Sequence, residues 1–167
     1  KFVVRDYRIS MDEKRFQGCG QVTAVLLSDL HGVWHGEDQE ALAKAVKDQN
    51  PDLILSAGDL ITAGGPCDGA YALMKKLAGA YPVFAGNGNH ETKLREEEPE
   101  SYETYERELK RLGVQMLRNE KASLTIHGLP IEVAGLEIGR EHYRRIGAKK
   151  VTDSEMDGLL PRPAAEK

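Results

Sequence analysis

The sequence predicts an α/β fold in which helices pack against a parallel sheet. Strand-sized apolar runs alternate with amphipathic stretches of helical length, and several of the runs end in short polar blocks. Parallel strands need crossover connections, so this alternation favours strand–helix–strand units. The chain has 167 residues, of which 40% are hydrophobic and 30% are charged. Such a size and composition are typical of one soluble domain, and we expect residues 1–167 to form a single domain.

The first part of the chain predicts two strands that are joined by a helix. Residues 2–9 alternate loosely and are rich in β-branched and aromatic side chains, which favours an additional strand at the start. The apolar run 21–28 predicts a strand that is buried on both faces. Residues 37–49 have apolar side chains at helical spacing and acidic residues in the first turn, as in an amphipathic helix. Pro51 ends this helix, and residues 52–57 predict the next buried strand.

The same pattern continues into the middle of the chain. Residues 68–79 predict a helix with one apolar side, and residues 81–85 predict a third strand. Residues 101–112 predict another amphipathic helix, because their tyrosines and leucines fall on one stripe. Gly113 is suited to end it.

The last part of the chain predicts shorter elements. Short strands are expected at 114–117, 123–126 and 131–134. The last two are expected to form a hairpin with a turn at His127 and Gly128. Residues 139–147 favour a helix, and the tail from about 155 to 167 is expected to be unstructured.

Three polar blocks follow the three predicted parallel strands. They are Asp29-Leu30-His31, Gly58-Asp59 and Gly88-Asn89-His90-Glu91. Because the carboxyl ends of parallel strands meet at one edge of a sheet, we expect these side chains to gather where such sheets bind ligands. Carboxylate, amide and imidazole groups are ligands of divalent metals. The blocks therefore predict a metal site, and with it the hydrolysis of phosphate esters.

The spacing within the blocks suits metal binding. Asp29 and His31 are two residues apart, so on an extended strand end they would point the same way and could share one ion. Gly58 allows a sharp turn before Asp59, whose two carboxylate oxygens could bridge two ions. Asn89 adds a neutral oxygen donor beside His90.

In this order, the blocks resemble those of the calcineurin-like metallophosphoesterase family. The resemblance covers roughly residues 2–136 and is closest to the bacterial branch of small, often membrane-associated phosphodiesterases. It is carried by Ser28-Asp29-Leu30-His31, by Pro51-Asp52-Leu53-Ile54 with Gly58-Asp59-Leu60, and by Gly88-Asn89-His90-Glu91. It implies a β-sandwich flanked by helices and two divalent metal ions. Manganese, iron and zinc suit these donors, and magnesium suits them less well.

The resemblance also implies a role for each residue. Asp29 and His31 would bind the first metal, Asp59 would bridge both metals, and Asn89 would bind the second. His90 would contact the phosphate and protonate or orient the leaving oxygen. We interpret Glu91 as a hydrogen-bond acceptor or helix-start residue rather than a ligand.

The family's later blocks, a lone His and Gly-His-x-His, have no counterpart here. Only His127 and His142 follow the third block, and we expect both to be exposed. By this comparison the fold is incomplete at its C-terminus, and the second metal keeps only Asp59 and Asn89. We therefore expect weak or no activity from this chain alone, as an N-terminal portion of a longer phosphoesterase. Whether another chain supplies the missing ligands is left open, as is the oligomeric state.

The main alternative is a non-catalytic scaffold with the same fold, although the presence of Asp59 and His90 favours an enzyme. The net charge is −4 and basic residues are scattered, which disfavours nucleic-acid binding. Gly86-Asn87-Gly88 lacks the third glycine of a dinucleotide loop, so no nucleoside cofactor is indicated. We interpret His35 as a solvated or rim residue. Trp34 either packs over the edge of the site or stacks on a substrate.

The expected substrate is a small-molecule or lipid phosphoester, as a monoester or a diester. No apolar run is long enough to span a bilayer. The sequence starts at Lys1 without an initiator Met, which leaves open an upstream anchor. We expect a cytoplasmic protein or one attached peripherally to a membrane.

Overall fold

A four-stranded parallel sheet is the central feature of the computed structural model, which describes residues 1–10, 20–143 and 147–160. The strand order is β1-β2-β3-β4, and all three pairings are parallel. The strands are β1 (Ala24–Leu27), β2 (Leu53–Ser56), β3 (Val83–Ala85) and β4 (Val114–Met116). The predicted α/β class with a parallel sheet is confirmed.

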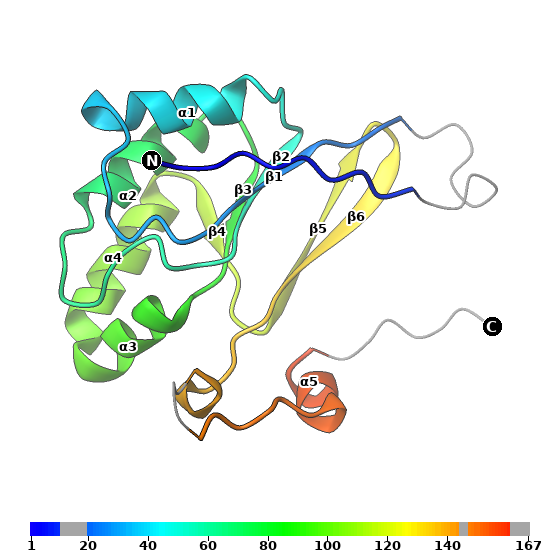
Figure 1. The fold of residues 1–167 in the computed structure, drawn as a ribbon. Coiled ribbons are helices and arrows are strands. Elements are labelled where there is room, and N and C mark those ends of the chain that lie inside the picture. Colours follow the sequence, from blue (N-terminus) through cyan, green and yellow to red (C-terminus); the bar gives the residue numbers. More distant parts are fainter. Residues whose placement is uncertain (11–19, 144–146, 161–167) are drawn as a thin grey trace, which may run out of the picture.

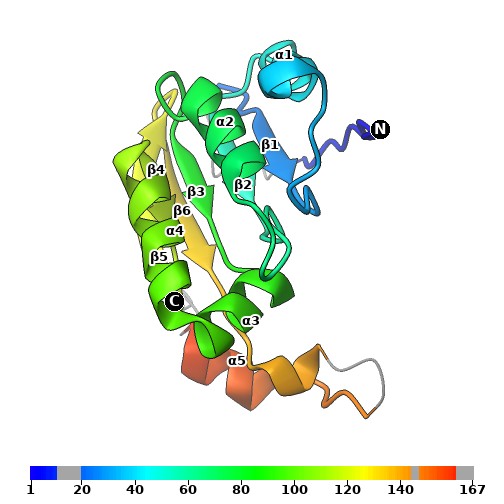
Figure 2. The same cartoon turned by 90° about the vertical axis from the view of Figure 1, so that its left-hand side faces the viewer.

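Helices cover one face of this sheet, as Figures 1 and 2 show. They are α1 (Glu40–Lys47), α2 (Asp68–Leu77) and α4 (Pro99–Arg111). A 3-10 turn, η1 (Glu37–Gln39), precedes α1. Their apolar stripes meet the strands in one core, in which Ile54, Leu73 and Leu109 are fully buried. Burial of such side chains contributes about 1.5–3 kcal/mol each. The stripes predicted from the sequence are therefore the faces that hold the helices on the sheet.

An antiparallel hairpin covers the opposite face of the sheet (Figure 1). It consists of β5 (Glu120–Ile126) and β6 (Leu129–Gly135). Its apolar residues Leu124 and Val133 pack against a second buried cluster that includes Leu53 and Phe84. The turn between the strands is His127-Gly128, and both residues have positive φ, as two-residue hairpin turns require. This second layer gives the sandwich-like arrangement that the resemblance implied.

A charged helix at the third polar block was not predicted. α3 (Asn89–Glu97) begins inside the third polar block and continues through a strongly charged stretch. Hydrophobic periodicity missed it because Leu94 is its only large apolar residue. Figure 2 shows α3 at the edge of the sheet where the strands end. The third block thus supplies the start of a helix.

The prediction of a strand at 2–9 is wrong, because residues 1–10 have no regular secondary structure. Phe2 packs against the core, but Val3, Tyr7 and Ile9 are exposed. The sequence pattern alternates as in a strand, but residues 1–10 pair with neither of the described sheets.

The C-terminal part also differs from expectation. The helix predicted at 139–147 is only the 3-10 turn η2 (Arg140–His142) within the described residues, and 144–146 lie outside them. The tail was expected to be unstructured from about residue 155, but α5 (Asp153–Leu159) forms there. A capping box explains this helix: the Thr152 hydroxyl accepts the Glu155 N–H, and the Glu155 carboxylate accepts the Thr152 N–H. Residues 161–167 lie outside the described residues.

Among the helices of the described residues, none combines the length and the apolar character that crossing a bilayer requires.

Candidate metal centre

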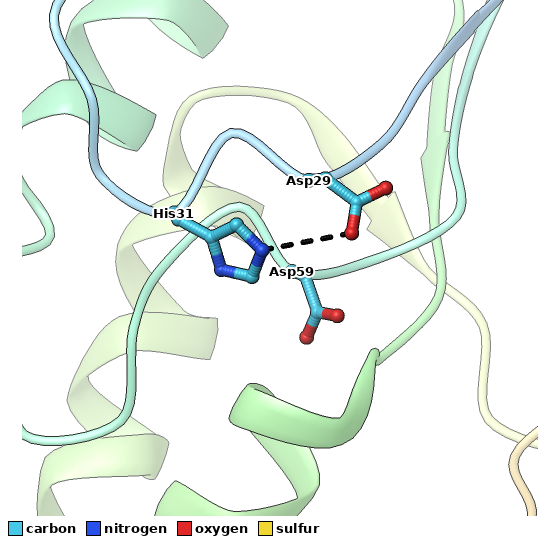
Figure 3. Close-up of side chains that lie close together, drawn as sticks. All are labelled: Asp29, His31 and Asp59. Atoms are coloured by element: carbon cyan, nitrogen blue, oxygen red, sulfur yellow. Dashed lines mark ion pairs between the residues drawn. The ribbon is translucent and has the colours of Figure 1, made fainter. Parts of the chain in front are cut away.

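The polar blocks meet at the carboxyl edge of the sheet. Asp29 follows β1, Asp59 follows β2 and Asn89 follows β3, so the order of the strands brings the three loops side by side. Figure 3 shows the side chains of Asp29, His31 and Asp59 close together, with the His31 ring beside the Asp29 carboxylate. One candidate ligand atom from each of these three lies within 4.8 Å of the others. Long-range topology therefore joins residues that are separate in the sequence.

The fit of these donors to one metal ion is close. Ligand atoms about 2.1 Å from one ion lie at most about 4.2 Å from each other. The observed spread of 4.8 Å is slightly wider. The His31 Nε2 atom lies 3.5 Å from Asp29 Oδ1, and the other Asp29 oxygen accepts the Ser28 hydroxyl. The Asp29 side chain is 67% exposed. The three donor atoms would have to move slightly closer together to bind one ion.

The first two loops are held together by backbone hydrogen bonds. The His31 N–H donates to the Asp59 carbonyl over 2.8 Å, and the Gly32 N–H donates to the Leu60 carbonyl over 2.9 Å. Asp29, His31 and Asp59 all have φ between 49° and 57°. The extended strand end expected for Asp29 and His31 is thus replaced by left-handed turns. Such conformations cost roughly 1–3 kcal/mol each and are typical of functional sites.

Two glycines let the second and third loops approach each other. A Cβ atom on Gly58 would lie 2.0 Å from the Gly88 nitrogen, and one on Gly88 would lie 2.3 Å from Asp59 Oδ1. Gly58 also has a φ of +94°. This approach allows the His90 N–H to donate to Asp59 Oδ1 over 2.9 Å. The backbone at the start of α3 is therefore in direct contact with the Asp59 carboxylate.

His90 is oriented by the backbone of the loop after β2. Its Nδ1 atom accepts the Ala63 N–H over 3.2 Å, so the neutral ring carries its proton on Nε2. The His90 ring packs edge-on against the His31 ring, with 5.0 Å between the ring centroids. Asn89 is the first residue of α3 and is half-buried. His90 thus lies beside His31 of the donor group, with its ring hydrogen on Nε2.

Glu91 links the second and third blocks through buried hydrogen bonds. Only 1% of Glu91 is exposed. Its carboxylate accepts four backbone N–H groups, from Asp59 (2.8 Å), Leu60 (2.8 Å), Ile61 (3.3 Å) and Gly88 (3.0 Å). Burial raises the pKa of Glu91, and the N–H donors oppose that rise. The interpretation of Glu91 as an acceptor rather than a ligand agrees with these contacts.

Gln39 supports the loop after His31 and was missed in the sequence. It is fully buried; its side chain accepts the His35 N–H and donates to the carbonyls of Val33 and Gly69. The loop that it braces leaves Trp34 49% exposed. The pKa of His35, which lies in the same loop, is lowered mainly by burial. Nothing in the sequence marks Gln39, because a glutamine near the start of a helix usually faces solvent.

Tyr143, at the end of η2, was also missed. Burial raises its pKa, and the negative charges of Asp59, Glu137 and Glu91 raise it further. Tyr143 is 40% exposed.

The two later histidines lie elsewhere. His127 is 54% exposed and its Nε2 atom lies 2.7 Å from Asp52 Oδ1, at the start of β2 and so at the opposite edge of the sheet from Asp59. His142 was expected to be exposed, but only 8% of its side chain is, and its Nδ1 atom lies 2.9 Å from the Lys149 carbonyl oxygen. Neither belongs to the group of donors found in the described residues.

Known proteins resemble this chain in sequence and in fold. A family model described as calcineurin-like phosphoesterase matches residues 22–156. An uncharacterized metallophosphoesterase of Bacillus subtilis (strain 168), YkoQ, is 29% identical over 133 residues, which are 77% of this chain and 48% of that protein. The crystal structure of phosphopantetheinyl hydrolase (PptH) from Mycobacterium tuberculosis has a TM-score of 0.54 at 20% identity, over 85% of this chain and 50% of that one. The latter likeness shows the fold alone, and the chain spans about half the length of both proteins.

Proposed function

Since this chain belongs to the calcineurin-like phosphoesterase family, we propose that its carboxyl sheet edge binds divalent metal ions for the hydrolysis of phosphate esters. Asp29, His31 and Asp59 hold the first ion, and Asp59 and Asn89 contribute to a second. The observation that carries the proposal is the group of three donor atoms within 4.8 Å of one another, with His90 beside it. The metals that suit these donors are manganese, iron or zinc.

Bound divalent ions would neutralise charge on the phosphoryl oxygens and lower the pKa of a bound water. The protein residues then have distinct tasks. Asp59 uses one oxygen to accept the His90 N–H and keeps its remaining lone pairs for metal. The neutral His90 ring carries its hydrogen on Nε2 and would orient the leaving oxygen through a hydrogen bond, and in its imidazolium form it would protonate that oxygen. The substrate is a phosphomonoester or a phosphodiester.

Hydrolysis of p-nitrophenyl phosphate and bis(p-nitrophenyl) phosphate tests this proposal. The chain is assayed with Mn²⁺, Zn²⁺ or Mg²⁺, beside Asp59→Asn and the control Asp48→Asn, which changes an exposed aspartate paired with Lys44. We expect slow hydrolysis that needs Mn²⁺ or Zn²⁺, is lost in Asp59→Asn and persists in Asp48→Asn. Equal rates in wild type and Asp59→Asn would overturn the proposal. No hydrolysis and no metal binding by the wild type would instead favour a non-catalytic scaffold.

A further inference from the structure

A buried carboxylate lies under α3 and has no part in the mechanism above. Glu137 follows β6 and is 8% exposed. Its Oε1 atom accepts the Asn87 amide over 3.1 Å and the Thr92 hydroxyl over 3.3 Å. Its Oε2 atom accepts the Arg95 guanidinium over 2.9 Å. Both carboxylate oxygens are thus satisfied by groups from the segment that carries the third polar block.

The partners of Glu137 lie on both sides of that block. Asn87 precedes it, and Thr92 and Arg95 follow it on α3. The Asn87 amide is also bonded at both of its polar atoms to the Tyr102 hydroxyl of α4, over 2.9 and 3.1 Å. A carboxylate that accepts hydrogen bonds from residues before and after a short segment restricts the position and direction of that segment.

Glu137 is itself held in place by the backbone. Its N–H donates to the Asn119 side chain over 2.8 Å, in the connection between β4 and β5. The acid therefore has little freedom to follow α3 if the helix moves. Loss of the acceptor would leave buried hydrogen-bond donors unsatisfied. Hydrogen bonds of Glu137 thus link the end of the hairpin to the first turns of α3.

Two buried carboxylates consequently hold the start of α3 from different sides. Glu91 ties it to the loop after β2, which carries Asp59. Glu137 ties it to the hairpin, which contributes no residue to the donor group. We propose that Glu137 is a positioning residue for the metal centre, which holds Asn89 and His90 against Asp59. Its effect on metal binding rests on the proposed function, whereas its effect on the position of α3 does not.

The first part of the test uses the metal-free chain. Backbone amide chemical shifts are compared by NMR among wild type, Glu137→Leu and Glu137→Gln, which keeps an acceptor oxygen. The control is Glu106→Leu, which removes a similarly shielded acid whose ion pairs are with Lys110 and Arg118. We expect Glu137→Leu to change the amide chemical shifts of Asn89, His90 and Asp59. Glu137→Gln should change these shifts less, and Glu106→Leu should leave them as in wild type.

The second part measures the affinity of the same proteins for Mn²⁺ alone by calorimetry. We expect Glu137→Leu to weaken binding about 10–100-fold, as loss of groups that orient metal ligands usually does. Glu137→Gln should restore most of the affinity, and Glu106→Leu should match wild type. If Glu137→Leu does not fold, Thr92→Val removes one contact and should give smaller changes in the same direction.

The outcomes separate the two proposals. A folded Glu137→Leu with unchanged amide shifts and wild-type Mn²⁺ affinity would overturn the positioning role. If the amide shifts of Glu137→Leu differ from those of wild type but the wild type binds no Mn²⁺, the result would support the positioning of α3 and contradict the proposed function.

Discussion

The Glu91 carboxylate accepts the Asp59 N–H over 2.8 Å, although the two residues are 32 positions apart. This contact joins the loop after β2 to the start of α3. It makes the positions of a proposed metal ligand and of the proposed acid, His90, depend on one buried side chain.

Glu91→Gln should therefore destabilise the fold. In wild type, both carboxylate oxygens of Glu91 accept backbone N–H groups. A glutamine replaces one of these oxygens by an NH₂ group, so buried N–H donors lose their acceptor. We expect the free energy of unfolding to fall by about 2–3 kcal/mol in urea denaturation. Glu97→Gln, an exposed change on the same helix, should have little effect. Similar losses in the two variants would contradict the linking role of Glu91.

Gly88→Ala should be more disruptive than its size suggests. The new Cβ atom would lie 2.3 Å from Asp59 Oδ1 and 2.6 Å from the Asp59 nitrogen, so the two loops must separate. We expect a loss of about 2–3 kcal/mol or more in unfolding free energy, together with loss of Mn²⁺ binding. Gly79→Ala is the matched control, because a Cβ atom there meets nothing within 4 Å. A stable Gly88→Ala that binds Mn²⁺ would show that the loops do not need this approach.

His90→Gln tests the proton-donating role. A glutamine side chain can donate a hydrogen bond but cannot transfer a proton, so kcat should fall about 10²–10⁴-fold while Mn²⁺ affinity stays close to wild type. The loss should be larger for phenyl phosphate than for p-nitrophenyl phosphate, because the poorer leaving group needs the acid more. Equal losses for both substrates would exclude His90 as the acid.

Sequence reasoning predicted the parts of the fold that depend on hydrophobic patterning. The runs that became β1, β2 and β3, and the stripes of α1, α2 and α4, are apolar at regular spacing. The parallel order then placed Asp29, Asp59 and Asn89 at one edge, and the family resemblance is confirmed by the family model.

The rest depended on features that the pattern does not contain. α3 is charged on most sides, so its start within the third block gave no periodic signal. The left-handed turns at Asp29 and His31 arise from hydrogen bonds between two loops rather than from local sequence. Gln39 and Glu137 are buried by elements that lie far away in the sequence, and a polar residue shows no sign of such burial when the sequence is considered alone.

The stability of the fold should depend on the ionisation of Asp52. A hydrogen bond from the Thr23 N–H lowers the pKa of Asp52 below 3.8; burial opposes this shift, and His127 adds to it. A carboxyl with a depressed folded pKa stabilises the protein fully above its unfolded value and loses that effect as pH falls through the folded pKa. The stabilisation that wild type has over Asp52→Asn should thus be present above pH 3.8 and shrink as the pH falls through the folded pKa of Asp52. A difference that stays constant throughout the acid range would contradict this assignment.

The central claim is that Asp29, His31 and Asp59 form a metal site, and metal content per chain tests it most directly. Wild type, Asp59→Asn and Asp48→Asn are equilibrated with excess Mn²⁺, desalted and subjected to elemental analysis. We predict at least one manganese ion per chain in wild type and Asp48→Asn, and none retained in Asp59→Asn. Equal manganese in all three proteins, or none in the wild type, would contradict the claim.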